Sequence, residues 1–361
     1  MLNAAPDKVK ALVTLSVQHG VKLLKANKTI AGTTGVFVHG AVYDLASGSL
    51  SFLGEAGKDS AVEPDPDFMS NPNEIIHVGS FATSEVRSAP QTNTSKTHTF
   101  TQPYSKPPRI VMGLTSFDVT IHNDNPRMIC SATNITATSF QVNINTWGSS
   151  QINNASCTWL EIPDTPDYAD FQVGAFSTSD DHPWNAVHAL TQRTITFAKA
   201  FTAPPTIVVW LTGFDTGQNA QMSLCAYATD VTATGFVMNL DTISGIPVYG
   251  QWTNWVAIPP ASPFGLQTTD FGVVGSLTQS TTQTSAFDQR DLNASLAPVV
   301  VGAMNQLVVG GPTAYRAKIT LGNLTGSTVD WTASTSGDAA LPTCKGTYIT
   351  IPGMKAASSV L

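Results

Sequence analysis

The sequence predicts a mainly all-β protein: three tandem antiparallel six-stranded β-sandwiches preceded by a small α+β segment. Three observations lead to this fold class. Only 12% of the 361 residues are charged, whereas Gly (27) and Pro (22) are abundant beside Thr, Ser and Asn, which are the residues of strand surfaces and turns. A strand pattern recurs three times along the chain. Within each copy, apolar and polar residues alternate.

The recurring pattern contains a ten-residue phrase that is written almost identically twice, SATNITATSF at 131–140 and YATDVTATGF at 227–236. Its third copy is TLGNLTGSTV at 320–329. A glycine-led strand, a proline-marked strand and a closing aromatic strand recur in register with it. The period of about 95 residues is that of a compact β domain rather than of a solenoid. The copies are VGSF, VGAF and VGSL; KPPRIVMGL, APPTIVVWL and APVVVGAM; and WLEIP, WVAIP and YITIP.

Alternation with a period of two divides one strand of each copy into a core face and an outer face. In FQVNINTWG the apolar set begins at Phe140 and the polar set at Gln141, and Trp147 falls on the polar face. Several such strands separated by turn signals predict an antiparallel sandwich. The predicted core residues are Phe140, Val142, Ile144, Phe236, Met238, Leu240, Val329, Trp331 and Ala333.

The domain organisation follows from these landmarks. Apolar spacing over residues 8–26 is compatible with a helix, and GVFVHGAVYDLASGSLSFL then predicts two strands joined by a turn at Ser47–Gly48. The EPDPD and SNPN clusters mark a linker. The expected boundaries are an α+β segment at 1–53, a linker at 54–76, and repeats at 77–163, 171–259 and 270–352.

Charge and composition exclude several partners. A net charge of -7 leaves no basic face for nucleic acid or an anionic membrane, and no stretch reaches the ~20 apolar residues of a membrane span. Asp7, Lys8 and Lys10 interrupt any would-be signal core, so we expect a cytoplasmic or non-classically exported protein. The four cysteines are too few and too scattered for a disulfide framework and are predicted to be core residues.

No catalytic or metal-binding motif is identified. Asp180 and Asp181, with His182 and His188, are interpreted as turn residues, because two histidines six apart on an irregular loop have no fixed ligand geometry. A glycosidase needs two carboxylates held across a cleft, and the repeats place no such pair. We therefore predict that the protein is not an enzyme and needs neither a cofactor nor a metal.

The combination of the VGSF strand, the Pro-Pro strand, the T-A-T-x-F phrase and the closing aromatic strand resembles the H-type lectin domain. The resemblance is clear over 77–163 and 171–259 and weaker over 270–352. It implies six-stranded sandwiches that associate as trimers and bind galactose or N-acetylgalactosamine without a metal, near subunit boundaries. The implied partners are glycans of glycoproteins or glycolipids, and either a homo-oligomer or an intramolecular pseudo-trimer is expected.

The resemblance also implies sugar-binding residues. The family's arginine, thirteen positions before the phrase's last residue, corresponds to Arg127 in the first repeat and Arg316 in the third, whereas the second repeat has Ser223. The family's aromatic residue corresponds to Trp147, and its tyrosine is matched only by Tyr249. A guanidinium suits donation to sugar hydroxyls, and an indole suits stacking on the apolar face of galactose. The aromatic position holds Ile243 and Ser336 in the other repeats, and Gly148, Ser244 and Gly337 replace the family's histidine.

Structural roles are the competing interpretations of these residues. A Trp in a β protein is usually core, although Trp147 lies on the polar face; Arg127 is open to being a solvated arginine in the turn HNDNPR. Arg316 and Tyr249 have no such Trp in their own repeats. Loss of the histidine in every repeat favours a scaffolding protein with relic sugar sites. Retention of Arg127 with Trp147 favours a multivalent lectin.

A second resemblance concerns the N-terminal segment. V-H-G-x-x-Y-D at 38–44, with the helix predicted before it, resembles the C-terminal end of β-class carbonic anhydrases. That family's zinc ligands lie in C-x-D-x-R and H-x-x-C stretches, which this chain lacks, so no such activity is expected and His39 is interpreted as a strand residue. Because two strands and a helix have too little core to be stable alone, we hypothesise that the segment mediates oligomerisation.

Overall fold

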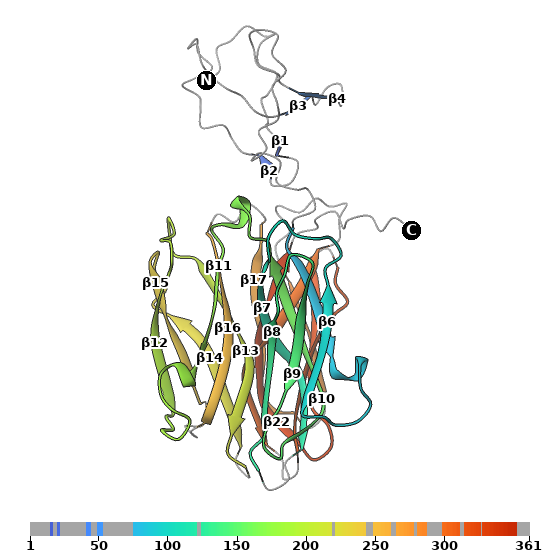
Figure 1. The fold of residues 1–361 in the computed structure, drawn as a ribbon, viewed down its shortest axis with the longest axis vertical. Coiled ribbons are helices and arrows are strands. Elements are labelled where there is room, and N and C mark those ends of the chain that lie inside the picture. Colours follow the sequence, from blue (N-terminus) through green and yellow to red (C-terminus); the bar gives the residue numbers. More distant parts are fainter. Residues whose placement is uncertain are drawn as a thin grey trace. The chain divides into compact units, whose positions relative to one another are not determined.

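A computed structural model gives the fold of the chain, which divides into two units, Met1–Pro72 and Asn73–Leu361 (Figure 1). In the first unit the structure describes four short strands only. In the second unit it describes most of the chain. The described residues are 15–16, 20–21, 41–44 and 49–52, and then 75–120, 124–218, 221–242, 248–260, 265–277, 280–286, 298–310, 314–325 and 327–351.

The described strands of the first unit form two antiparallel pairs. β1 (Leu15–Ser16) pairs with β2 (Gly20–Val21), so the helix predicted over 8–26 is wrong at these four residues, and the rest of it lies outside the described residues. β3 (Ala41–Asp44) pairs with β4 (Ser49–Phe52), which confirms the two strands predicted around the turn. The expected linker at 54–76 is described only at its last two residues.

In its described residues, the second unit contains three repeats of six strands each. Short 3-10 turns, η1 (Thr83–Glu85), η2 (Pro166–Tyr168) and η3 (Thr178–Asp180), connect some of them. The strands are β5 (His77–Ala82), β6 (Asn93–Thr99), β7 (Arg109–Thr120), β8 (Arg127–Thr133), β9 (Ser139–Asn145) and β10 (Gln151–Ile162); β11 (Gln172–Ser177), β12 (Leu190–Thr196), β13 (Thr206–Thr216), β14 (Met222–Thr229), β15 (Gly235–Asp241) and β16 (Val248–Ile258); and β17 (Gln267–Leu277), β18 (Ser280–Ala286), β19 (Val299–Gly310), β20 (Ala314–Gly322), β21 (Thr328–Ser334) and β22 (Ala340–Ile351).

The three repeats share their sheets. Each repeat places its first, third and sixth strands in one sheet and its other three in another, and each sheet continues into a neighbouring repeat. The junctions between repeats are β8 with β13, β14 with β19, and β20 with β7; Figure 1 shows β13 running beside β8. Every repeat therefore shares a sheet with both others, as an intramolecular pseudo-trimer. The sheet orders are β18-β21-β20-β7-β10-β5, β11-β16-β13-β8-β9-β6 and β12-β15-β14-β19-β22-β17.

The core faces predicted from alternation are confirmed, because all nine side chains are 2% exposed or less. A second apolar cluster lies where the repeats meet, and Trp210 is its largest member. The Trp210 indole is fully buried and its Nε1 donates to the carbonyl of Thr347 over 2.9 Å. Gly113 and Ala303, at the matching strand positions, are small because a Cβ on Gly113 would overlap Ala303 and contact Trp210. One indole thus fills the space that the three repeats share.

Two further predictions concern the cysteines and membrane-spanning segments. All four cysteines are free thiols; three are buried and Cys225 is half-buried, which fits their predicted role as core residues. Desolvation on burial raises the pKa of the Cys225 thiol to about 11 and that of Cys344 to about 12, so both stay protonated at neutral pH. Among the described residues, no helix is long and apolar enough to cross a bilayer.

A buried carboxylate distinguishes the first repeat from the second. Glu161 is 3% exposed, and its oxygens lie 3.1 Å from Nε2 of His98 and 2.9 Å from the donors of Tyr104 and Trp159. Burial opposes its charge, but the hydrogen bonds from His98, Trp159 and Tyr104 outweigh burial and lower the pKa of Glu161. In the second repeat, Ala257 stands at the position of Glu161, Ile195 at that of His98 and Phe201 at that of Tyr104. All three polar members of the network are therefore apolar there.

The Glu161→Gln variant is expected to unfold about 2–3 kcal/mol more easily at neutral pH, because charge-assisted hydrogen bonds become weaker neutral ones. A lowered folded-state pKa means that the carboxylate stabilises the fold above the ordinary glutamate pKa and stops doing so as the pH falls through the lowered value. Urea denaturation between about pH 7 and pH 3 should therefore show the difference from wild type shrinking with acid. A difference independent of pH would contradict this account.

Candidate functional site

An ion cluster joins the first and second repeats at the start of β8. Arg127 lies directly opposite Asp215 of β13 in the shared sheet. Its Nε lies 3.1 Å from Oδ2 of Asp215, and its Nη1 lies 2.7 Å from Oδ2 of Asp124. Asn125 also donates to Asp215, over 3.1 Å. One guanidinium is therefore held between carboxylates of two repeats.

The electrostatics of this cluster keep the guanidinium charged and fixed. Burial opposes the charge of Arg127, but Asp124 and Asp215 together raise its pKa. The hydrogen bond from Arg127, with one from the Ser149 amide, holds the pKa of Asp124 far below its usual value, whereas burial raises that of Asp215. Among the residues that the structure describes, Nη2 of Arg127 has no partner. It remains available as a donor to a ligand.

Two indoles lie beside the ion cluster. Asp215 pairs on its other side with Gly250 of β16, and the ring of Trp252 occupies the space that a Cβ on Gly250 would take. Trp147, which follows β9 of the first repeat, contacts Trp252 edge to face with ring centroids 5.8 Å apart. Both indoles are half-buried. The boundary therefore offers a fixed cation, two carboxylates and an aromatic surface contributed by both repeats.

The glycine after Trp147 has a structural reason. Gly148 has φ 66°, in the left-handed region that favours glycine, and a Cβ there would collide with Nη1 of Arg127 and the carboxylate of Asp124. Gly337, at the matching position of the third repeat, has φ 68° and lies against Arg316 in the same way. At these two boundaries the loop backbone covers the guanidinium where the lectin pattern has a histidine.

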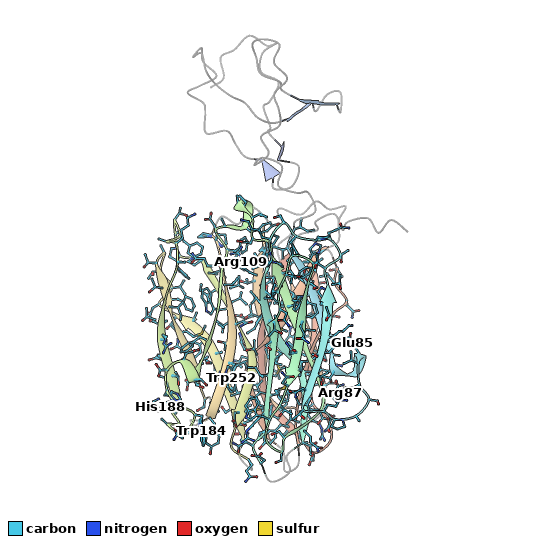
Figure 2. All side chains as sticks on the ribbon, viewed as in Figure 1. Glu85, Arg87, Arg109, Trp184, His188 and Trp252 are labelled. Atoms are coloured by element: carbon cyan, nitrogen blue, oxygen red, sulfur yellow. The ribbon has the colours of Figure 1, made fainter. Side chains whose placement is uncertain are left out.

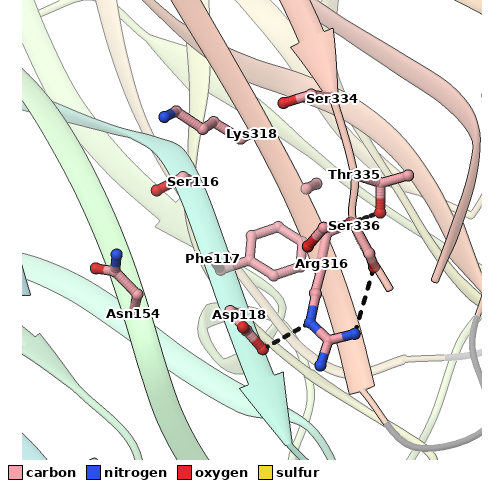
Figure 3. Close-up of a pocket in the computed structure, with 10 residues that line it drawn as sticks. Ser116, Phe117, Asp118, Asn154, Arg316, Lys318, Ser334, Thr335 and Ser336 are labelled. Atoms are coloured by element: carbon pink, nitrogen blue, oxygen red, sulfur yellow. Dashed lines mark hydrogen bonds and ion pairs between the residues drawn. The ribbon is translucent and has the colours of Figure 1, made fainter. Parts of the chain in front are cut away.

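A second ion cluster joins the third and first repeats. Arg316 lies opposite Asp118 in the shared sheet. Its Nε lies 3.1 Å from Oδ1 of Asp118, and its Nη1 lies 3.1 Å from Oδ1 of Asp338. Ser336 and Ser156 occupy the positions that Trp147 and Trp252 hold at the first boundary, so this cluster has no indole pair. It borders a pocket of ≈ 250 Å³ that Arg316 and Asp118 help to line (Figure 3). The lining residues are Ser116, Phe117, Asp118, Asn154, Arg316, Ala317, Lys318, Ser334, Thr335 and Ser336.

The third boundary, between the second and third repeats, has lost both charges. Ser223 of β14 lies opposite Val308 of β19, and both are buried. Ser223 is equivalent to Arg127 of the first repeat, and Val308 is equivalent to Asp215 of the second. Arginine and aspartate are thus kept or lost together across each boundary, although they come from different repeats.

Tyr249 contacts an exposed indole of its own repeat. It precedes Gly250 on β16 at a register shift, where β13 pairs with Val248 and Gly250 and skips Tyr249. Its ring contacts Trp184, with centroids 6.4 Å apart, and the Trp184 side chain is 68% exposed. Figure 2 shows Trp184 and Trp252 in the same half of the second unit. Ile243 lies outside the described residues.

The structure brings together only part of the predicted set. Arg127 and Trp147 lie at one boundary, Arg316 lies at another, and Tyr249 contacts Trp184. Sequence reasoning missed Asp215, Asp118 and Trp252, which neighbouring repeats contribute. A signal for the aspartates was present, since Phe-Asp occurs at 117–118 and 214–215 but Leu-Val at 307–308, and Ser223 alone breaks the arginine series.

Comparison with known proteins finds a domain match in the first two repeats. The H-type lectin domain model matches residues 95–160 and 192–258, which run from β6 into β10 and from β12 through β16. A protein of Fuscovulum blasticum described as "ATP synthase subunits region ORF 7" is 35% identical over 75 residues, 21% of this chain and 64% of that protein, so the chain covers less than two thirds of it. The domain match supports a carbohydrate-binding role and gives no support to a catalytic one. The carbonic anhydrase resemblance of the N-terminal segment stays a prediction.

Proposed function

We propose that the chain is a multivalent carbohydrate-binding lectin whose principal site lies at the boundary of the first and second repeats. The observation that carries this proposal is the Arg127–Asp215 ion pair beside the Trp147–Trp252 indoles. All four residues belong to the two segments that match the H-type lectin domain.

The chemistry of the boundary suits a sugar. The free Nη2 of Arg127 donates to a hydroxyl oxygen, and the remaining carboxylate lone pairs of Asp124 and Asp215 accept from hydroxyl groups. The ion cluster already fixes the Arg127 donor and the Asp124 and Asp215 acceptors. Little side-chain entropy is therefore lost when a sugar binds. The half-buried indoles supply an apolar surface for a ring face that carries C–H groups.

For the ligand we propose terminal galactose or N-acetylgalactosamine on glycoproteins or glycolipids. The axial O4 of these sugars leaves a patch of C–H groups on one ring face, which matches an indole surface. Gly148 presents backbone where the lectin pattern has an imidazole. Recognition of the hydroxyls is therefore assigned to Arg127 and its two carboxylates.

Multivalency follows from the repeats. The Arg316 boundary is proposed as a second, weaker site because it keeps the ion cluster but has serines in place of the indoles. A single shallow site of about -4 kcal/mol corresponds to millimolar affinity, and linked sites raise avidity without new contacts. We propose that a homo-oligomer multiplies these sites further.

The test compares wild type with Trp147→Ala and Trp252→Ala on a glycan array, followed by titration of the best ligand. Both variants should bind at least about tenfold more weakly, since loss of a well-packed ring commonly costs more than 1.4 kcal/mol. Trp184→Ala, which removes an exposed indole outside the ion cluster, is the matched control and should bind like wild type.

A scaffolding protein with relic sugar sites is the second candidate. The uncharged Ser223–Val308 boundary favours it, because one of three boundaries has already lost the ion cluster. A blank array for a wild type that is folded by circular dichroism would support the scaffold. Binding that both tryptophan substitutions leave unchanged would keep a lectin but move its site away from the first boundary.

A further inference from the structure

The loop between η3 and β12 gathers three potential metal ligands. Two histidines on an irregular loop predict no ligand geometry, yet the fold places one ligand atom each of Asp181, His182 and His188 within 4.8 Å of one another. The two imidazole centroids are 4.3 Å apart and tilted by 42°. Figure 2 shows His188 near Trp184, on the same loop.

Short-range hydrogen bonds hold this loop in shape. Asp180 accepts from the amide and hydroxyl of Ser177, and the amide of His182 donates to the carbonyl of Thr178 over 3.0 Å. The amide of Ala186 then donates to the carbonyl of Pro183 over 2.9 Å, which turns the chain back and brings His188 beside His182. Local turns therefore set the ligand positions.

His182 is oriented by its surroundings. It is 7% exposed, its Nε2 lies 2.9 Å from the hydroxyl of Thr191, and its Nδ1 lies 3.2 Å from the carbonyl of Pro183. Because the Pro183 carbonyl only accepts, Nδ1 carries the proton and Nε2 keeps the lone pair, which now accepts from the Thr191 hydroxyl. A metal would bind through Nε2 and displace that hydroxyl. A polar partner on the non-ligating nitrogen is the usual arrangement of a metal-binding histidine, because it fixes the ring and raises its basicity.

The carboxylate of Asp181 is available to a cation. Oδ1 lies 3.5 Å from Nη2 of Arg193, longer than an ordinary charge-assisted hydrogen bond. Arg193 is held elsewhere, since it also donates to the carbonyl of Asp180 and its guanidinium lies 5.1 Å from the ring centroid of Phe176. Asp181 and His188 are both exposed, so a hydrated ion has access and their side chains have room to adjust.

We infer that Asp181, His182 and His188 form a binding site for a divalent first-row transition metal, of which Zn²⁺ fits best. Two imidazoles and one carboxylate suit zinc, whereas calcium and magnesium prefer oxygen ligands. Metal–ligand distances of about 2.0–2.2 Å require the three atoms to move closer, which the two exposed side chains permit. Three protein ligands leave the fourth position to water. A bound ion would also stiffen the loop that presents Trp184 to Tyr249.

The experiment uses the full chain stripped with a chelator. Titration with ZnCl₂ by calorimetry should reveal one saturable site per chain, and CoCl₂ should give the intense visible absorption of a four-coordinate ion. His188→Gln and Asp181→Asn alter exposed side chains, so the fold is expected to persist, and each should weaken zinc binding by more than about tenfold.

Asp170→Asn is the matched control, because Asp170 is an exposed carboxylate paired with Lys199 and lies outside the loop. It should bind zinc like wild type. Absence of saturable uptake by wild type, or equal affinity in wild type and His188→Gln, would overturn the inference. The result is independent of sugar binding, since uptake is measured with the metal alone.

Discussion

Arg127→Ala should weaken binding of the best glycan by about 10- to 100-fold, which corresponds to the 1.5–3 kcal/mol of a charge-assisted hydrogen bond. The substitution removes the donor Nη2 and also the cation that positions Asp124 and Asp215. The two carboxylates would then lie close together without a cation between them, although Ser149 and Asn125 still donate to them. Titration of the purified variant with the glycan selected on the array measures the loss.

Controls separate lost recognition from lost stability. Arg316→Ala removes the equivalent cation at the boundary without indoles and should reduce avidity on a dense glycan surface while leaving the stronger site's affinity unchanged. Arg127→Ala combined with Asp215→Ala removes the half-buried carboxylate that has lost its cation, so its thermal stability should recover while its sugar affinity should not. Undiminished affinity in Arg127→Ala would contradict the assignment of this boundary as the principal site.

The features predicted correctly from sequence are local ones. Phe140, Phe236 and Trp331 were placed in the core by alternation within a single strand, which needs no knowledge of neighbours. The same alternation put Trp147 on the outer face, where it contacts Trp252. Repetition of these local signals was enough to count the repeats and to assign their fold class.

The sharing of sheets between repeats is not visible in any one repeat. A strand pattern fixes which face of a strand is buried, but each sandwich offers several edges for pairing, and register across repeats depends on the assembled fold. Arg127 and Asp215 are 88 residues apart in sequence. Spacing within one repeat could therefore identify the arginine and the first indole but not the aspartate and second indole that complete the site.

Tyr249 was assigned by counting positions, and its role in sugar binding stays a prediction. Its offset matches the lectin pattern, and in the fold it falls at a register shift, where β13 pairs with Val248 and Gly250 and skips Tyr249. In the N-terminal segment, apolar spacing compatible with a helix was too weak a constraint on secondary structure.

Short apolar runs fit both the helical period of about 3.6 residues and the strand period of about 2. The described residues between 15 and 21 pair as strands.

Trp210→Ala should lower the free energy of unfolding by about 3–5 kcal/mol, the range for truncating a fully buried tryptophan. The cost is expected to be large because Gly113 and Ala303 already carry the smallest side chains and have no atoms to extend into the cavity. The lost indole also leaves the carbonyl of Thr347 without its donor.

Urea denaturation followed by circular dichroism measures this effect, with Trp184→Ala as the exposed control that should change stability by less than about 0.5 kcal/mol. Because Trp210 belongs to the cluster where the three repeats meet, its loss should also loosen the boundary that holds Arg127 against Asp215, and sugar affinity should fall together with stability. Equal stability of Trp210→Ala and Trp184→Ala would mean that the junction of the repeats is not a close-packed core, and that the sandwiches are held together by their shared sheets alone.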